Sequence, residues 1–214
     1  MRMRRKKNGA ARLAACEEFI FPPDIKDPAE AFGNADPVHL EIGCGKGDFV
    51  CGMAEANPDV NFIAIERISD VLMLAAEKAK AKDLKNVKLA VMNAAVLNEK
   101  FAPGSISRIY LNFSDPWPKK GYAKRRLTYR AFLDIYKQIL TDDGSIFLKT
   151  DDENLFDFSI EELTLSGFEI TDMTRDLHAS EYAKDNIMTE YERNFTEMGK
   201  KINMLRAYLK GDGK

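Results

Sequence analysis

The sequence alternates between short, continuous apolar runs and longer segments whose apolar residues recur at helical spacing. The short runs predict buried strands, and the spaced segments predict helices that cover them. Strands are predicted over residues 38–42, 60–66, 87–92, 106–113, 145–149 and 168–173, with 189–195 as a candidate seventh. Helices are predicted over residues 48–56, 69–82, 126–140 and 155–166. Alternation of this kind is typical of an α/β fold, with a parallel sheet and helices on both faces.

The first 36 residues do not follow this alternation. They begin with a basic cluster and continue with a segment rich in Pro and Asp. We therefore predict a basic N-terminal arm and irregular lead-in over residues 1–36, followed by a single domain over 37–214. The basic cluster fits a solvated tail and a phosphate-binding arm equally well. It consists of Arg2, Arg4, Arg5, Lys6, Lys7 and Arg12.

The composition limits the class of protein and the partners that this chain can have. The 214 residues are 45% hydrophobic and 31% charged, with a net charge of −2, which is typical of a soluble globular protein. No apolar run has transmembrane length, and no secretory signal is recognisable, so we expect a cytoplasmic protein. Three cysteines and two histidines lack zinc-site spacing, so no metal is expected. A small net charge does not exclude a nucleic-acid partner, because binding follows the local field.

A glycine turn follows the first predicted strand, where parallel sheets bind ligands. It begins at Glu41 and contains Gly43, Gly45 and Gly47, whereas the dinucleotide fingerprint is G-x-G-x-x-G. The acidic residues Glu41 and Asp48 would repel a pyrophosphate but suit a cationic nucleoside such as S-adenosylmethionine. Glu66, at the end of the second strand, can accept from ribose hydroxyls. The glycines alone would also fit an ordinary structural turn.

The second candidate segment runs Asp115-Pro116-Trp117-Pro118-Lys119-Lys120 and follows the fourth strand. Two prolines stiffen the loop, because each fixes φ and removes a backbone donor. An aromatic residue beside several cations is typical of a site that stacks a base and holds phosphates. In isolation, Trp117 packed in the core with solvated lysines after it would explain the same residues.

Together with Lys149-Thr150-Asp151 and Thr189-Glu190-Tyr191-Glu192, these segments resemble bacterial tRNA (guanine-N7-)-methyltransferases from about residue 38 onward. The resemblance implies a Rossmann-like class I methyltransferase fold. Such a fold has a seven-stranded, mostly parallel sheet with helices on both faces and the last strand antiparallel. It also implies methyl transfer from S-adenosylmethionine to N7 of guanine 46 in the variable loop of tRNA.

The resemblance assigns residues as well. Asp115 is implied as the catalytic residue. Cofactor contacts are expected from Glu41, Gly43, Gly45, Gly47, Glu66, Asn93 and Asp115. Substrate contacts are expected from Lys119, Asp151, Thr189, Glu190, Tyr191 and Glu192. Further RNA contacts are expected from Gly121, Tyr122, Ala123, Lys124, Arg125 and Arg126. The family often has Asp where this chain has Asn93, whose carbonyl can still accept from the adenine amino group.

The expected chemistry requires little acid–base catalysis, because guanine N7 already presents an in-plane lone pair. Asp115 would offset the positive charge that appears on the ring, and Glu192 or Glu190 would accept from guanine N1–H and N2. Lys119 would donate to O6 or to a phosphate. Two alternatives are a class I methyltransferase acting on another base or a protein amide, and a non-catalytic RNA-binding module. Without the resemblance, residues 189–192 would be interpreted as a polar edge strand.

Overall fold

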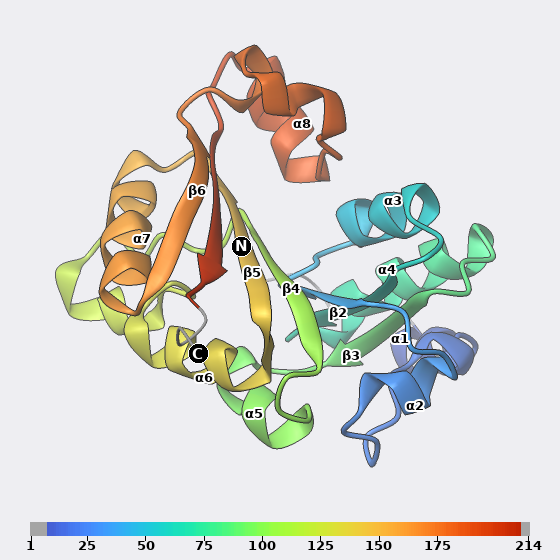
Figure 1. The fold of residues 1–214 in the computed structure, drawn as a ribbon. Coiled ribbons are helices and arrows are strands. Elements are labelled where there is room, and N and C mark those ends of the chain that lie inside the picture. Colours follow the sequence, from blue (N-terminus) through green and yellow to red (C-terminus); the bar gives the residue numbers. More distant parts are fainter. Residues whose placement is uncertain (1–7, 211–214) are drawn as a thin grey trace.

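The computed structural model describes residues 8–210. These residues form one seven-stranded sheet with helices on both faces (Figure 1). The strand order is β3-β2-β1-β4-β5-β7-β6. Strands β1 to β5 pair in parallel, whereas β7 pairs antiparallel with both β5 and β6. The predicted sheet type is therefore confirmed. Its strands are β1 (Val38–Ile42), β2 (Asn61–Glu66), β3 (Val87–Val91), β4 (Ile106–Asn112), β5 (Leu140–Thr150), β6 (Phe168–Thr174) and β7 (Asn203–Leu209).

Alternate strand residues enter two separate cores, one on each face of the sheet. Leu40 and Ile63 pack with α5 (Leu97–Lys100), α6 (Arg130–Ile139) and α7 (Glu153–Leu165). On the other face, Phe62 and Ala64 pack with α3 (Asp48–Ala56) and α4 (Ser69–Ala81). Burial on both faces explains the continuous apolar strands of the sequence.

Part of the predicted irregular lead-in is helical. It contains α1 (Gly9–Ala14), the single 3₁₀ turn η1 (Glu17–Phe19) and α2 (Pro28–Phe32). Helix α1 packs against α4, where Arg12 donates two hydrogen bonds to Glu77 at 2.7 and 2.6 Å. Such short helices are stabilised by tertiary packing, which the composition of the segment does not reveal. The other five residues of the predicted basic cluster, at positions 2–7, lie outside the described residues.

Two predicted boundaries also need correction. Helix α6 begins at Arg130 and not at residue 126. Arg126 has an extended backbone, and its side chain bonds to the loop after β4. Strand β5 begins at Leu140, so the Asp143-Gly144 pair lies inside it and does not precede it. No helix within residues 8–210 is long and apolar enough to span a membrane.

The prediction of a strand over residues 189–195 is wrong. The segment forms α8 (Glu190–Glu197), above the end of the sheet in Figure 1, and the seventh strand follows at 203–209. Thr189 caps this helix, because its Oγ1 accepts from the N–H of Glu192 at 2.9 Å. The Glu192 carboxylate accepts in return from the N–H of Thr189 at 3.4 Å. Thr-x-x-Glu is the sequence pattern of this capping box.

Candidate active site

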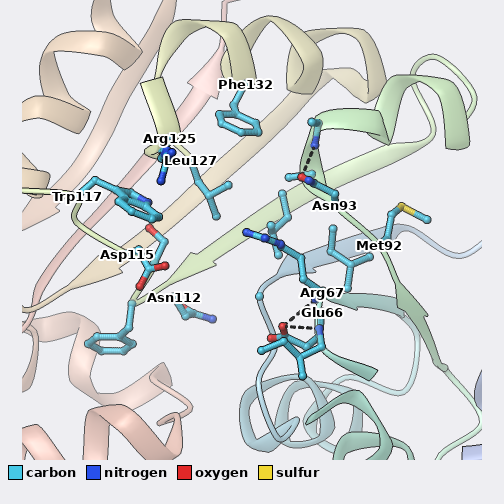
Figure 2. A pocket seen from close by; sticks show the side chains of 18 of the residues that line it. Glu66, Arg67, Met92, Asn93, Asn112, Asp115, Trp117, Arg125, Leu127 and Phe132 are labelled. Carbon is cyan, nitrogen blue, oxygen red and sulfur yellow. Dashed lines mark hydrogen bonds between the residues drawn. The ribbon is translucent and has the colours of Figure 1, made fainter. Parts of the chain in front are cut away.

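A pocket of about 900 Å³ opens beyond the carboxyl ends of β1 to β4. We call its two sides the β2 wall and the β4 wall, and Figure 2 shows side chains from both. The β2 wall consists of Ile42, Gly43, Ile65, Glu66, Arg67, Ile68, Met92, Asn93, Ala94 and Ala95. The β4 wall consists of Asn112, Phe113, Ser114, Asp115, Trp117, Lys124, Arg125, Leu127 and Phe132.

The glycine turn connects β1 to α3, and it contributes Gly43 to the β2 wall. Its three glycines have left-handed φ angles of 82°, 55° and 78° at residues 43, 45 and 47, which other residues rarely adopt. At Gly47 a Cβ atom would also lie 2.7 Å from the Cβ of Ala75, so α4 can approach only a glycine. Of the three, Gly43 lines the pocket, while the other two shape the turn behind it.

Glu66 ends β2 and points its carboxylate at the turn that precedes α4. Its oxygens accept from the backbone N–H groups of Arg67 at 2.7 Å, Ile68 at 3.1 Å and Gly45 at 3.3 Å. A carboxylate at a helix N-terminus is favoured by the helix dipole. The acid predicted to bind ribose is therefore held at the pocket by backbone donors.

Glu41 lies behind the glycine turn and is 3% exposed. Its Oε1 accepts from Asn112 Nδ2 at 2.9 Å, but its Oε2 has no hydrogen-bond partner within residues 8–210. Burial raises the pKa of Glu41 to about 7, and the hydrogen bond from Asn112 and the charge of Lys149 oppose that rise. An unsatisfied buried oxygen is costly, so this acid is suited to a cationic or hydrogen-bonding ligand.

Asn93 follows β3 and lines the pocket. Its Oδ1 accepts from the N–H of Ala95 at 3.0 Å and thereby caps the short turn η2 (Ala94–Val96) (Figure 2). The carbonyl predicted to meet adenine is thus already engaged once, which leaves one lone pair for a ligand. An aspartate at this position could keep the cap and offer a second oxygen.

The loop after β4 has a strained backbone. Phe113 and Trp117 have left-handed φ angles of 52° and 42°, a conformation that costs about 1–3 kcal/mol in a residue with a side chain. Arg126 holds this loop, because its guanidinium donates to the carbonyl of Pro116 at 2.8 Å and to that of Trp117 at 3.1 Å. Arg126 is buried over the ring of Phe158. The structure therefore places this predicted RNA contact inside the protein.

The remaining predicted RNA residues lie on the surface around the turn η3 (Lys120–Arg125). Arg125 stacks 4.9 Å from the ring of Trp117 and 4.7 Å from the ring of Tyr122. Lys119, Gly121 and Lys124 are exposed beside them, and Ala123 is half-buried. This cluster presents aromatic faces and cations together, as single-stranded nucleic-acid sites do.

Helix α8 brings further predicted residues to the β4 wall. The ring of Tyr191 lies 5.0 Å from that of Phe113 and is stacked 4.2 Å from that of Phe195. Burial, followed by the negative charges of Asp151 and Asp115, raises the pKa of Tyr191. Asp115 is exposed and has no ion-pair partner within residues 8–210, whereas Asp151 pairs with Lys200 at 3.0 Å.

The other predicted residues of this helix face two directions. Glu190 is half-exposed and pairs with Lys46 of the glycine turn at 2.7 Å. Thr189 is used as the helix cap, and Glu192 is fully buried against Lys149 at 2.6 Å. Tyr191 thus contacts the β4 wall and Glu190 contacts the glycine turn, while Thr189 and Glu192 make their contacts within the protein.

Comparison with known proteins decides the family. A family model described as "Putative methyltransferase" matches residues 35–205. A tRNA (guanine-N(7)-)-methyltransferase of Brevibacillus brevis is 45% identical over 97% of this chain and 98% of its own. One from Geobacillus kaustophilus is 48% identical over 97% and 96%. The chain belongs to the tRNA (guanine-N7-)-methyltransferase family.

Solved structures agree with this family at the level of the fold. The 16S rRNA methyltransferase KamB superposes with a TM-score of 0.65 at 14% identity and covers 89% of this chain and 97% of its own. An antibiotic-related methyltransferase gives 0.62 at 19% identity, with 85% and 91% covered. The class I methyltransferase fold is thereby confirmed.

Some residues of this methyltransferase pocket were not found from the sequence. Phe113, Leu127 and Phe132 line the β4 wall but have the apolar character of core residues. Lys149 belonged to a recognised motif, yet its pairing with Glu192 was not predicted. The one signal was a lysine inside an otherwise apolar strand. No group of three potential metal-ligating side chains occurs among the described residues.

Proposed function

We propose that this cytoplasmic enzyme transfers a methyl group from S-adenosylmethionine to N7 of guanine 46 in the variable loop of tRNA, forming 7-methylguanosine. One observation carries the proposal beyond family membership: a single pocket joins a carboxylate-bearing β2 wall to an aromatic and basic β4 wall that includes Asp115. The β2 wall suits a cationic nucleoside, and the β4 wall suits an RNA base with its phosphates.

The residues of the β2 wall, together with Glu41 behind the glycine turn, fit the cofactor. The unpartnered Oε2 of Glu41 provides a buried acceptor behind the glycine turn, where a cationic group would be favourable. Glu66 would accept from the ribose hydroxyls, and Asn93 would contact the adenine between Met92 and Leu127. The backbone of Gly43, Gly45 and Gly47 would allow a close approach. When bound, S-adenosylmethionine supplies a methyl group on positively charged sulfur.

The residues of the β4 wall would orient the guanine. Because N7 needs no deprotonation, most of the catalysis comes from holding it in line with the methyl group, which contributes on the order of 7 kcal/mol. Asp115 would stabilise the positive charge that appears on the guanine ring. Its exposure at the pocket edge and its freedom from any ion pair within residues 8–210 leave its carboxylate available.

The remaining contacts would come from the surface around this wall. Lys119 and Lys124 would hold phosphates, and Trp117 with Arg125 and Tyr122 would stack against unpaired nucleotides. Asp151 and Tyr191 would meet the substrate near Asp115. Of the two acids predicted to read the guanine edge, the half-exposed Glu190 is the better placed.

Methyl transfer from labelled S-adenosylmethionine tests this proposal directly. The substrates are an unmodified tRNA transcript and a matched transcript in which guanine 46 is replaced by adenine. We expect label on the first and none on the second. Label on both would move the target to another base, and label on neither, with the cofactor bound, would favour a different substrate class.

A further inference from the structure

The pair of Lys149 and Glu192 is sealed from solvent. Their side chains are 7% and 0% exposed, and Lys149 Nζ lies 2.6 Å from Glu192 Oε2. Lys149 comes from the end of β5 and Glu192 from the first turn of α8, 43 residues later. The pair therefore connects the central sheet to the helix that carries Tyr191.

Hydrogen bonds within the protein use all three donors of the lysine and most acceptor positions of the carboxylate. The lysine ammonium has three donors, and they meet Glu192, the Oδ1 of Asn186 at 3.0 Å and the carbonyl of Ile187 at 3.0 Å. The Glu192 carboxylate accepts from Lys149, from Asn186 Nδ2 at 2.5 Å and from the N–H of Thr189. Its Oε1 also lies 3.2 Å from His178 Nε2. The Glu192 side chain is 0% exposed and makes these contacts inside the protein, so a guanine has no access to it in this arrangement.

The surrounding contacts show what the pair holds in place. Next to Glu192, Glu190 reaches Lys46 of the glycine turn, and Arg193 reaches Asp48 at 3.3 Å. Ile187 packs so closely on α3 that a Cβ atom at Gly52 would lie 2.8 Å from its Cγ2. These contacts bring α8 across the glycine turn, and its Tyr191 meets Phe113 of the β4 wall.

We propose that Lys149 and Glu192 are positioning residues, which dock α8 so that Tyr191 packs on Phe113 of the β4 wall, and that neither touches the RNA. The inference rests on the proposed methyl transfer to tRNA and adds how the substrate side of the pocket is assembled. Removing one partner of a buried ion pair leaves an uncompensated charge and is strongly destabilising, whereas replacing both with neutral groups of similar size is tolerated. A positioning role therefore predicts that a double substitution restores activity, whereas a direct contact of Glu192 with the RNA predicts that it does not.

The test compares Glu192→Gln, Lys149→Met and the double variant, each at saturating cofactor. Each single variant is expected to lower kcat/KM for tRNA at least tenfold, mainly through KM. The double variant is expected to return to within about fivefold of the wild type, because no buried charge is left unpaired. Glu197→Gln, an exposed acid on the same helix, is the matched control and should match the wild type. A double variant as impaired as Glu192→Gln would overturn the proposal.

Amide hydrogen exchange of α8 without RNA gives a second readout. An undocked helix exchanges at least tenfold faster in Glu192→Gln, while loss of a mere substrate contact leaves the exchange of the free protein unchanged. Unchanged protection with lost activity would therefore also overturn the proposal. If a single variant fails to fold, the activity of the double variant decides between a positioning role and a direct RNA contact. Absence of methyl transfer by the wild type would contradict the proposed function alone, because the exchange experiment needs no activity.

Discussion

The two walls of the pocket are built in different ways. On the β2 wall, most hydrogen bonds of the polar side chains go to backbone groups one or two residues away, as from Glu66 to Arg67 and from Asn93 to Ala95, although Glu66 also bonds Gly45 of the glycine turn. The β4 wall is instead supported from behind by contacts between segments far apart in the sequence, including the pair that links Lys149 to a residue 43 positions later and thereby holds α8. A small cofactor can thus be recognised by a locally formed turn, whereas the site for a large substrate depends on tertiary packing.

This difference predicts where substitutions act. Changes on the β2 wall should alter cofactor binding or local stability, because its groups are held by nearby backbone. Changes on the β4 wall should alter turnover and RNA binding while the cofactor side stays intact. Three experiments test this separation.

The largest effect is expected at Asp115. We expect Asp115→Ala to lower kcat by about 10²–10³, because the charge developing on guanine loses its stabilising carboxylate. Cofactor affinity, measured by calorimetry, should change by less than tenfold. Asp142→Ala, an exposed acid of β5, serves as the control and should be neutral. Full activity of Asp115→Ala would contradict the assignment, and loss of cofactor binding would break the separation of the two walls.

Glu41 should produce the next largest effect, on stability. Its pKa rises from 4.5 to about 7 on folding, so between these pH values the folded protein binds more protons than the unfolded chain. The resulting stabilisation is present below pH 4.5 and is lost as pH rises through 7, with a total on the order of 3 kcal/mol. Urea unfolding at several pH values measures it. Glu41→Gln should lack this decline, and parallel curves for both proteins would contradict the expectation.

The smallest effect compares two adjacent arginines. Arg126→Ala removes two hydrogen bonds from a buried charged group, so we expect unfolding to become easier by about 1.5–3 kcal/mol. Arg125→Ala should leave stability unchanged but weaken tRNA binding and reduce its salt dependence by about one phosphate contact. Urea unfolding and binding at several salt concentrations distinguish them. A salt effect confined to Arg126→Ala would reverse our interpretation of the loop.

The same contrast explains what could be predicted from the sequence. The apolar runs, the glycine turn and Glu66 depend on local patterns, and the structure places them as expected. Arg126 sits among basic neighbours and was grouped with them, but only its contacts with Pro116 and Trp117 show that it is buried. Residues 189–195 were predicted as a strand, although Thr189 and Glu192 have capping-box spacing. The pairing of Lys149 cannot be read from any window of sequence.

The position of β7 has a consequence for how the chain assembles during synthesis. Strand β6 is made earlier, yet its only neighbour in the described sheet is β7, which lies between it and β5. Residues 168–174 therefore have no strand to pair with until residues 203–209 leave the ribosome. The five parallel strands can form while α8 is still being made, because domains fold as their N-terminal parts emerge. A ribosome stalled before residue 203 would thus hold a five-stranded sheet that already has its glycine turn, with β6 unpaired and β7 not yet made.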